Sequence, residues 1–160
     1  MGRFLAVWRN QDLALLVFPE PEETPEALIA KYLHVSMNEF GPETSRQKEL
    51  GRAIARFAEG KHVELPRLCL TGTPFQLKVW KALLETPLGA LTNYGRIAET
   101  LGSHPRAVGA AVGANPIALF VPCHRVVHAT GEADGYRWGN ARKSQLLKAE
   151  GSTGYSFKAA

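Results

Sequence analysis

Cysteine is scarce in this sequence, and its scarcity excludes several classes of protein. Among 160 residues only Cys69 and Cys123 occur, so a disulfide framework is not expected and a four-cysteine zinc site is impossible. No stretch approaches the roughly 18 apolar residues of a membrane span, and the N-terminus lacks the apolar core of a secretory signal. We therefore expect a reducing, cytoplasmic location, no membrane partner, and no metal or cofactor.

The net charge of +4 is distributed unevenly along the chain. Residues 1–68 hold nine Lys or Arg and ten Asp or Glu, whereas residues 69–160 hold ten and five, so the two parts carry −1 and +5. Positive charge confined to the second half favours a polyanionic partner, such as nucleic acid, for that half alone. A well-solvated surface would account for the charge equally well.

The first half of the chain has the patterns of a small strand-and-helix domain, which we place at 1–70. Strand-like runs at 4–8 and 13–18 flank a polar turn and predict a hairpin. Thr24 and Pro25 are typical of a helix start and predict a helix over 25–33. Apolar residues at helical spacing predict a second helix over 45–58, and 63–70 is expected to be extended.

The second half is expected to form a mainly helical domain over 71–160, which makes the fold class α/β, of the α+β kind. Its first helix begins at Thr73 and Pro74, and the apolar face is expected to comprise Phe75, Val79, Trp80, Leu83 and Leu84. Two shorter helices are expected over 94–101 and from Ser103 and Pro105 towards 115. The tight link between them is typical of a helix-turn-helix.

The second helix of this pair consists largely of small residues, among them Ala107, Gly109 and Ala110. Glycine costs a helix about 1 kcal/mol relative to alanine, so its presence needs a reason. One reason is close approach to a DNA groove, and the other is close packing against a second helix. Arg106 at the helix start favours DNA, because recognition helices usually present their N-terminal residues to it.

Cys123 lies in the run Pro122-Cys123-His124-Arg125, which points to a nucleophile. The thiolate is the reactive form of cysteine, so a working cysteine needs a lowered pKa. Pro122 favours a helical turn whose positive end lies near Cys123, and His124 and Arg125 add charge or proton exchange. An isolated cysteine is more often a small buried hydrophobe, and we expect that role for Cys69. Glu150 could orient His124, although the sequence does not show that the two are close.

Several runs in the second half resemble the O6-alkylguanine-DNA alkyltransferases, also called methylated-DNA–protein-cysteine methyltransferases. The match covers about residues 71–151, in order and in spacing. The matching runs are Gly72-Thr73-Pro74-Phe75-Gln76, Tyr94-Gly95-Arg96-Ile97-Ala98, Arg106-Ala107-Val108-Gly109, Asn115-Pro116, Pro122-Cys123-His124-Arg125-Val126, Gly135-Tyr136-Arg137-Trp138-Gly139 and Leu146-Leu147-Lys148-Ala149-Glu150-Gly151.

The resemblance implies a catalytic role for five residues. Cys123 would accept the alkyl group, His124 would take its proton through a water, and Glu150 would orient His124. Tyr94 would hydrogen-bond the flipped guanine, and Asn115 would brace the turn after the recognition helix. The thioether product has no acyl carbon for water to attack, so the protein would be consumed after one turnover.

The resemblance also implies how DNA would be held. Arg106 would fill the gap left in the base stack, and Ala107, Gly109 and Ala110 would face the groove. Four residues would form the substrate pocket: Val126, Tyr136, Arg137 and Trp138. Trp138 would either narrow that pocket or pack internally. The expected partner is double-stranded DNA containing alkylated guanine, with O4-alkylthymine as a further target, bound by a monomer that flips the damaged base.

Two other functions are compatible with parts of the sequence. A helix-turn-helix protein that only binds DNA would explain the basic second half but gives Cys123 and His124 no task. A cysteine hydrolase would use that pair but leaves Arg106 and the small-residue helix unexplained.

Overall fold

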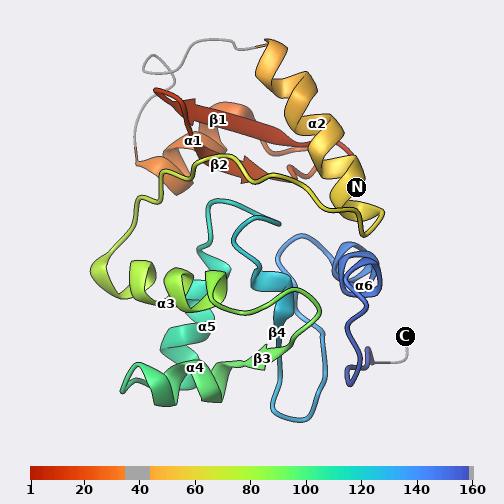
Figure 1. Cartoon of the computed structure of the whole chain (residues 1–160). Coiled ribbons are helices and arrows are strands. Elements are labelled where there is room, and N and C mark those ends of the chain that lie inside the picture. Colours follow the sequence, from red (N-terminus) through yellow and green to blue (C-terminus); the bar gives the residue numbers. More distant parts are fainter. Residues whose placement is uncertain (35–43, 159–160) are drawn as a thin grey trace.

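The computed structural model describes residues 1–34 and 44–158, and it combines helices with small sheets. Within these ranges the strands form two sheets of two strands each. Figure 1 shows a hairpin flanked by helices on one side of the molecule and a group of helices on the other. The α/β fold class is therefore confirmed. In the part of the chain that is described, no helix is both long and apolar enough to cross a membrane.

The predicted hairpin is present as β1 (Leu5–Arg9) and β2 (Asp12–Val17), which pair antiparallel. Asn10 turns the chain with a φ of 56°, a conformation that asparagine tolerates better than most residues. The residues from Leu13 to Phe18 are buried almost completely. A strand that is buried on both faces has a continuous run of apolar residues, and this segment shows that pattern.

The second edge of β2 joins the hairpin to later parts of the chain. At its start, the Leu13 amide donates to the Arg67 carbonyl at 2.8 Å. Near its end, the Leu16 amide donates to the Pro116 carbonyl at 2.9 Å, and the Ala118 amide donates to the Leu16 carbonyl at 2.7 Å. One apolar core runs through both halves of the chain. The N-terminal half thus supports the segment that leads to Cys123, and the division at 70/71 stays a prediction.

Two helices flank the hairpin, as predicted. Helix α1 (Pro25–Leu33) begins at Thr24, whose hydroxyl accepts a hydrogen bond from the Ala27 amide at 3.3 Å. Helix α2 (Thr44–Ala58) starts one residue before the predicted position and buries Leu50 and Ile54. Figure 1 shows α2 lying across the sheet and reaching towards α6 (Asn140–Ala149), a helix that the residue patterns did not predict.

Helix α3 (Pro74–Leu84) opens the second half with a capping box formed by Thr73 and Gln76. Val79, Trp80 and Leu83 are buried on its inner face. The prediction for Leu84 was wrong, because this side chain is 41% exposed. Leu84 is the last helical residue, and it is rotated about 100° from Leu83, away from the core.

The predicted helix-turn-helix consists of α4 (Tyr94–Thr100) and α5 (Pro105–Gly113), which pack against each other. Its second helix is capped by His104, whose Nδ1 accepts from the Arg106 amide at 3.2 Å. A histidine ring nitrogen can replace the usual hydroxyl acceptor at this position. Strands β3 (Thr92–Asn93) and β4 (Val126–Val127) pair in parallel and bring the start of α4 beside the segment after Cys123.

Candidate active site

Cys123 begins a single 3-10 turn, Cys123–Arg125, directly after Pro122. The helical turn predicted from the proline is therefore present. Cys123 is buried, with 5% of its surface exposed. The second cysteine, Cys69, packs against the main apolar core as a structural side chain, as expected, although it is only partly buried. It lies next to Leu68, whose main chain forms an isolated bridge to the hairpin at the edge of the core.

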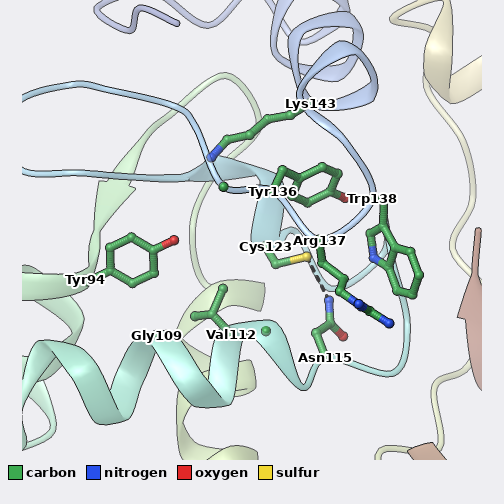
Figure 2. Close-up of a pocket in the computed structure, with 11 residues that line it drawn as sticks. Tyr94, Gly109, Val112, Asn115, Cys123, Tyr136, Arg137, Trp138 and Lys143 are labelled. Atoms are coloured by element: carbon green, nitrogen blue, oxygen red, sulfur yellow. Dashed lines mark hydrogen bonds between the residues drawn. The ribbon is translucent and has the colours of Figure 1, made fainter. Parts of the chain in front are cut away.

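Asn115 connects the end of the recognition helix to the cysteine. Its side chain is 2% exposed, and its Nδ2 donates to the Val121 carbonyl at 2.9 Å and to the Cys123 sulfur at 3.1 Å. Its Oδ1 accepts from the Ile117 amide at 2.9 Å. Figure 2 shows the amide directly beneath the sulfur. One side chain thus holds the loop after α5 and contacts the Cys123 sulfur.

His124 and Arg125 share one carboxylate behind the cysteine. His124 Nε2 lies 2.8 Å from Glu150 Oε1, while Arg125 donates from Nε and Nη2 to the two oxygens of Glu150, each at 2.9 Å. Arg125 Nη1 also donates to the Thr86 carbonyl at 2.6 Å. Burial raises the pKa of Glu150, but hydrogen bonds from both partners outweigh it and lower the pKa to about 2. The carboxylate is therefore ionised, and the structure brings Glu150 to His124.

The state of His124 follows from this contact. An ionised carboxylate only accepts hydrogen bonds, so Nε2 of His124 carries the proton. Complete burial lowers the pKa of His124 more than Glu150 raises it, so the ring is neutral near pH 7. Its Nδ1 is buried and has no hydrogen-bond partner among residues 1–34 and 44–158. Nδ1 is then a lone-pair acceptor that is free to take a proton.

The expectation of a lowered pKa for Cys123 was wrong. Burial raises the pKa of the thiol, and this effect exceeds the opposing effects of its neighbours. Asn115, Tyr136 and Lys143 each lower the pKa. The Tyr136 hydroxyl interacts with the thiol, although within the described residues it makes no well-formed hydrogen bond. An environment without water disfavours the thiolate. The local sequence around Cys123 does not reveal this burial.

A pocket of about 70 Å³ leads to the cysteine, and several separate parts of the chain form its walls. Tyr94 at the start of α4 stands on one side, and Gly109 and Val112 of α5 form the floor. The loop at 135–138 closes the other side with Tyr136, Arg137 and Trp138 (Figure 2). Val126, which was expected in the substrate pocket, is fully buried and does not line it. His124 and Glu150 likewise lie behind the cysteine and not in the wall.

Lys143 lines the same pocket, and the sequence analysis missed it. This residue of α6 is 1% exposed, and its Nζ donates to the Val126 carbonyl at 2.6 Å. Burial lowers its pKa to about 8, while the nearby thiol acts in the opposite direction. Its spacing from Leu146 and Leu147, three and four residues later, places it on their buried helical face. A lysine on an apolar stripe was the signal that could have revealed it.

The outer face of α5 presents small side chains to solvent. Arg106, Ala107 and Ala110 are exposed, whereas Val108 and Ala111 are buried against the neighbouring helices. Gly109 is partly exposed next to the Tyr94 ring, from which an added Cβ would be 3.8 Å away. Of the residues expected to contact DNA, Tyr94 and Gly109 line the pocket, whereas Arg106, Ala107 and Ala110 lie on the exposed face of α5.

Comparison with known proteins agrees with this geometry. Residues 74–152 match the family model described as 6-O-methylguanine DNA methyltransferase, DNA binding domain. The regulatory protein ada of Salmonella typhimurium is 49% identical over 154 residues, which are 93% of this chain and 42% of that protein. A methylated-DNA–protein-cysteine methyltransferase of Lodderomyces elongisporus is 53% identical over 95 residues, or 58% of this chain and 47% of that protein.

A solved structure extends the match to both halves. The Mycobacterium tuberculosis OGT in complex with DNA superposes with a TM-score of 0.74 and 34% identity, covering 92% of this chain and 86% of that one. The chain belongs to the O6-methylguanine-DNA methyltransferase family. It spans about half the length of the curated members of this family that it matches. The family resemblance of the Cys123 segment is therefore confirmed, while the roles of individual residues stay predictions.

Proposed function

We propose that this protein repairs DNA by moving the alkyl group of O6-alkylguanine onto Cys123, irreversibly and once per molecule. The observation that carries the proposal is a buried cysteine, hydrogen-bonded by Asn115, at the end of a pocket that opens beside α5. The same alkyl–oxygen bond occurs in O4-alkylthymine, which we propose as a second substrate. The partner is duplex DNA containing such a base, bound by a monomer in the reducing cytoplasm, where the thiol stays free.

The chain's own groups account for the movement of the proton and the alkyl group. The thiol proton passes through a water to Nδ1 of His124, which becomes an imidazolium held by Glu150. The Cys123 sulfur then forms a bond to the alkyl carbon as the bond from that carbon to O6 breaks. The electron pair of that bond leaves with the guanine. The new thioether has no carbonyl that water can attack, so Cys123 is not regenerated.

Tyr94 is suited to neutralise the departing guanine. Its hydroxyl stands at the pocket wall, and burial raises its pKa, with the nearby Cys123 thiol adding to the effect. The phenol therefore stays protonated and can donate a hydrogen bond to the negative charge that develops on the base. We propose that Tyr94 supplies this proton or hydrogen bond.

Access to DNA is explained best by the exposed face of α5. An added Cβ at Gly109 would meet only ordinary contacts, and at Gly113 it would meet nothing within 4 Å. Internal helix packing therefore does not require glycine at either position. Close approach by an external partner remains as the reason, and a DNA groove fits the neighbouring Arg106. Because the thiol lies inside a pocket, the base must leave the duplex to reach it.

The test uses duplex DNA with a radiolabelled O6-methylguanine. We expect label on the protein at no more than one equivalent, located on Cys123 by peptide mapping. Cys123→Ala should bind the DNA without acquiring label, and Cys69→Ser, the matched control, should acquire it normally. Binding without any label by the unaltered protein would indicate a DNA-binding protein only. Turnover of an ester substrate would indicate a hydrolase.

A further inference from the structure

The pocket loop is tied to the N-terminal half of the chain through Arg137. Its Nε donates to the Tyr32 hydroxyl at 3.2 Å, and its Nη2 donates to Glu23 Oε1 at 3.2 Å. Tyr32 belongs to α1, and Glu23 lies just before that helix. Neither residue lines the pocket, whereas Arg137 does. Two residues from the N-terminal half therefore contact a pocket residue without lining the pocket themselves.

Both anchors are themselves held in place. The second oxygen of Glu23 accepts from the Glu20 amide at 3.1 Å, and Lys31 stands 3.9 Å from the first. Tyr32 is 7% exposed, so its ring has little room to move. The Arg137 side chain is 39% exposed, so it would be mobile in solvent without these hydrogen bonds. Bonds to two fixed partners restrict it to one position.

The adjacent wall residue, Trp138, is anchored in the same place. Its ring is 6.2 Å from the ring of Tyr32 and 6.4 Å from that of Phe18, and it is 2% exposed. The Arg137 guanidinium lies over it, 5.2 Å from the ring centre. Arg142 links the loop to the N-terminus by donating hydrogen bonds to the carbonyls of Trp138 and Met1. The wall beside Cys123 therefore packs against Tyr32 of α1 and against Phe18, the residue that follows β2.

We propose that Glu23 and Tyr32 are positioning residues that limit the size of the alkyl group this protein accepts, by holding Arg137 against Trp138. The inference rests on the proposed function. A methyl group needs little room beyond the sulfur, so the held wall does not hinder it. A bulky group has to displace the wall, and the displacement breaks the contacts that Glu23 and Tyr32 make with Arg137.

Two conservative changes test this role. Glu23→Gln removes the charge but keeps an acceptor, and Tyr32→Phe removes the hydroxyl but keeps the ring against Trp138. Single-turnover rates are measured on duplexes with O6-methylguanine or O6-benzylguanine. We expect the benzyl-to-methyl rate ratio to rise about two- to fivefold in each variant, the range for one half-exposed charged hydrogen bond. Glu22→Gln, a change in the exposed neighbour, is the control and should leave the ratio unaltered.

Further measurements separate positioning from a general loss of structure. In an Arg137→Met background neither change should alter the ratio, because the residue through which they act is absent. An unchanged ratio in the native background, equal losses with both substrates, or a persistent effect without Arg137 would each overturn the proposal. If the unaltered protein transfers neither group to Cys123, the proposed function itself has failed, which is a separate result.

Discussion

Replacing Glu150 by glutamine keeps the shape of the side chain and removes its charge. The carboxylate is 2% exposed and accepts hydrogen bonds from His124 and from two nitrogens of Arg125. An amide nitrogen donates and does not accept, so one of these N–H groups must face another donor. Arg125 would also keep a buried charge without a counter-ion. We therefore expect Glu150→Gln to destabilise the protein strongly.

The size of the effect can be derived in two ways. Breaking a buried ion pair by removing one partner costs about 3–5 kcal/mol. Independently, the lowering of the Glu150 pKa from 4.5 to about 2 corresponds to about 3 kcal/mol of stabilisation in the folded state. The two values agree. For a protein of this length they predict a fall in Tm of about 6–20 °C.

The contribution of Glu150 should depend on pH in a defined direction. Its folded-state pKa lies below the ordinary value of 4.5, so the unfolded chain takes up the proton first as pH falls. The stabilisation is complete above about pH 5 and is lost progressively towards pH 2. The difference between the native protein and Glu150→Gln should therefore be roughly 1–2 kcal/mol smaller at pH 3.5 than at pH 7.

Urea unfolding at pH 7, 5 and 3.5 measures these differences directly. Glu99→Gln, which alters an exposed carboxylate of α4, is the control and should change the free energy of unfolding by less than about 0.5 kcal/mol. A loss below about 1 kcal/mol for Glu150→Gln at pH 7 would refute the buried-pair argument. A loss that is the same at all three pH values would refute the pKa assignment.

Three further changes test other parts of the site. Asn115→Ala leaves the Ile117 amide without its partner and removes one of the two hydrogen bonds that the Val121 carbonyl accepts, and calorimetry should show a loss of about 2–4 kcal/mol. Lys143→Met removes the cation that lowers the pKa of Cys123, so iodoacetamide should alkylate the thiol more slowly at pH 7.5 and the midpoint of the pH–rate profile should rise. Arg106→Ala should slow transfer from duplex DNA by about tenfold or more while leaving reaction with free O6-methylguanine nearly unchanged, because flipping costs a few kcal/mol. Unaltered unfolding, an unchanged profile and equal losses with both substrates, respectively, would contradict these three expectations.

Much of the fold was predictable because the residues that start its helices are adjacent in the sequence. Thr24 with Pro25, and Thr73 with Pro74, cap their helices as the sequence indicates. The pairing of β3 with β4 was not predictable, because two-residue strands contain no periodic pattern. The bridge from Leu16 to Ile117 joins residues about a hundred positions apart, and no local signal indicates it.

Some parts of the candidate site could likewise be predicted from the sequence, and others could not. Cys123 and His124 could be proposed from adjacent residues, and Glu150 from the family resemblance. The tie from Arg137 to Glu23 and Tyr32 could not, because it depends on how the two halves dock. The direction of the Cys123 pKa was mistaken for a related reason. Charge near a residue can be read from the sequence, whereas the burial that opposes it is a property of the whole fold.

The raised pKa of Cys123 suits the proposed function, in which each molecule transfers one alkyl group. A permanent thiolate would react with stray oxidants and electrophiles, and each such event would remove one molecule from use. Here burial favours the protonated thiol, while the proposed acceptor for its proton, Nδ1 of His124, has no other partner among the described residues, and Glu150 holds the opposite ring nitrogen. In the proposed mechanism the thiolate forms only when a substrate fills the pocket and the proton moves. We therefore expect slow reaction with small alkylating agents and fast reaction with a damaged duplex, both from this arrangement of groups.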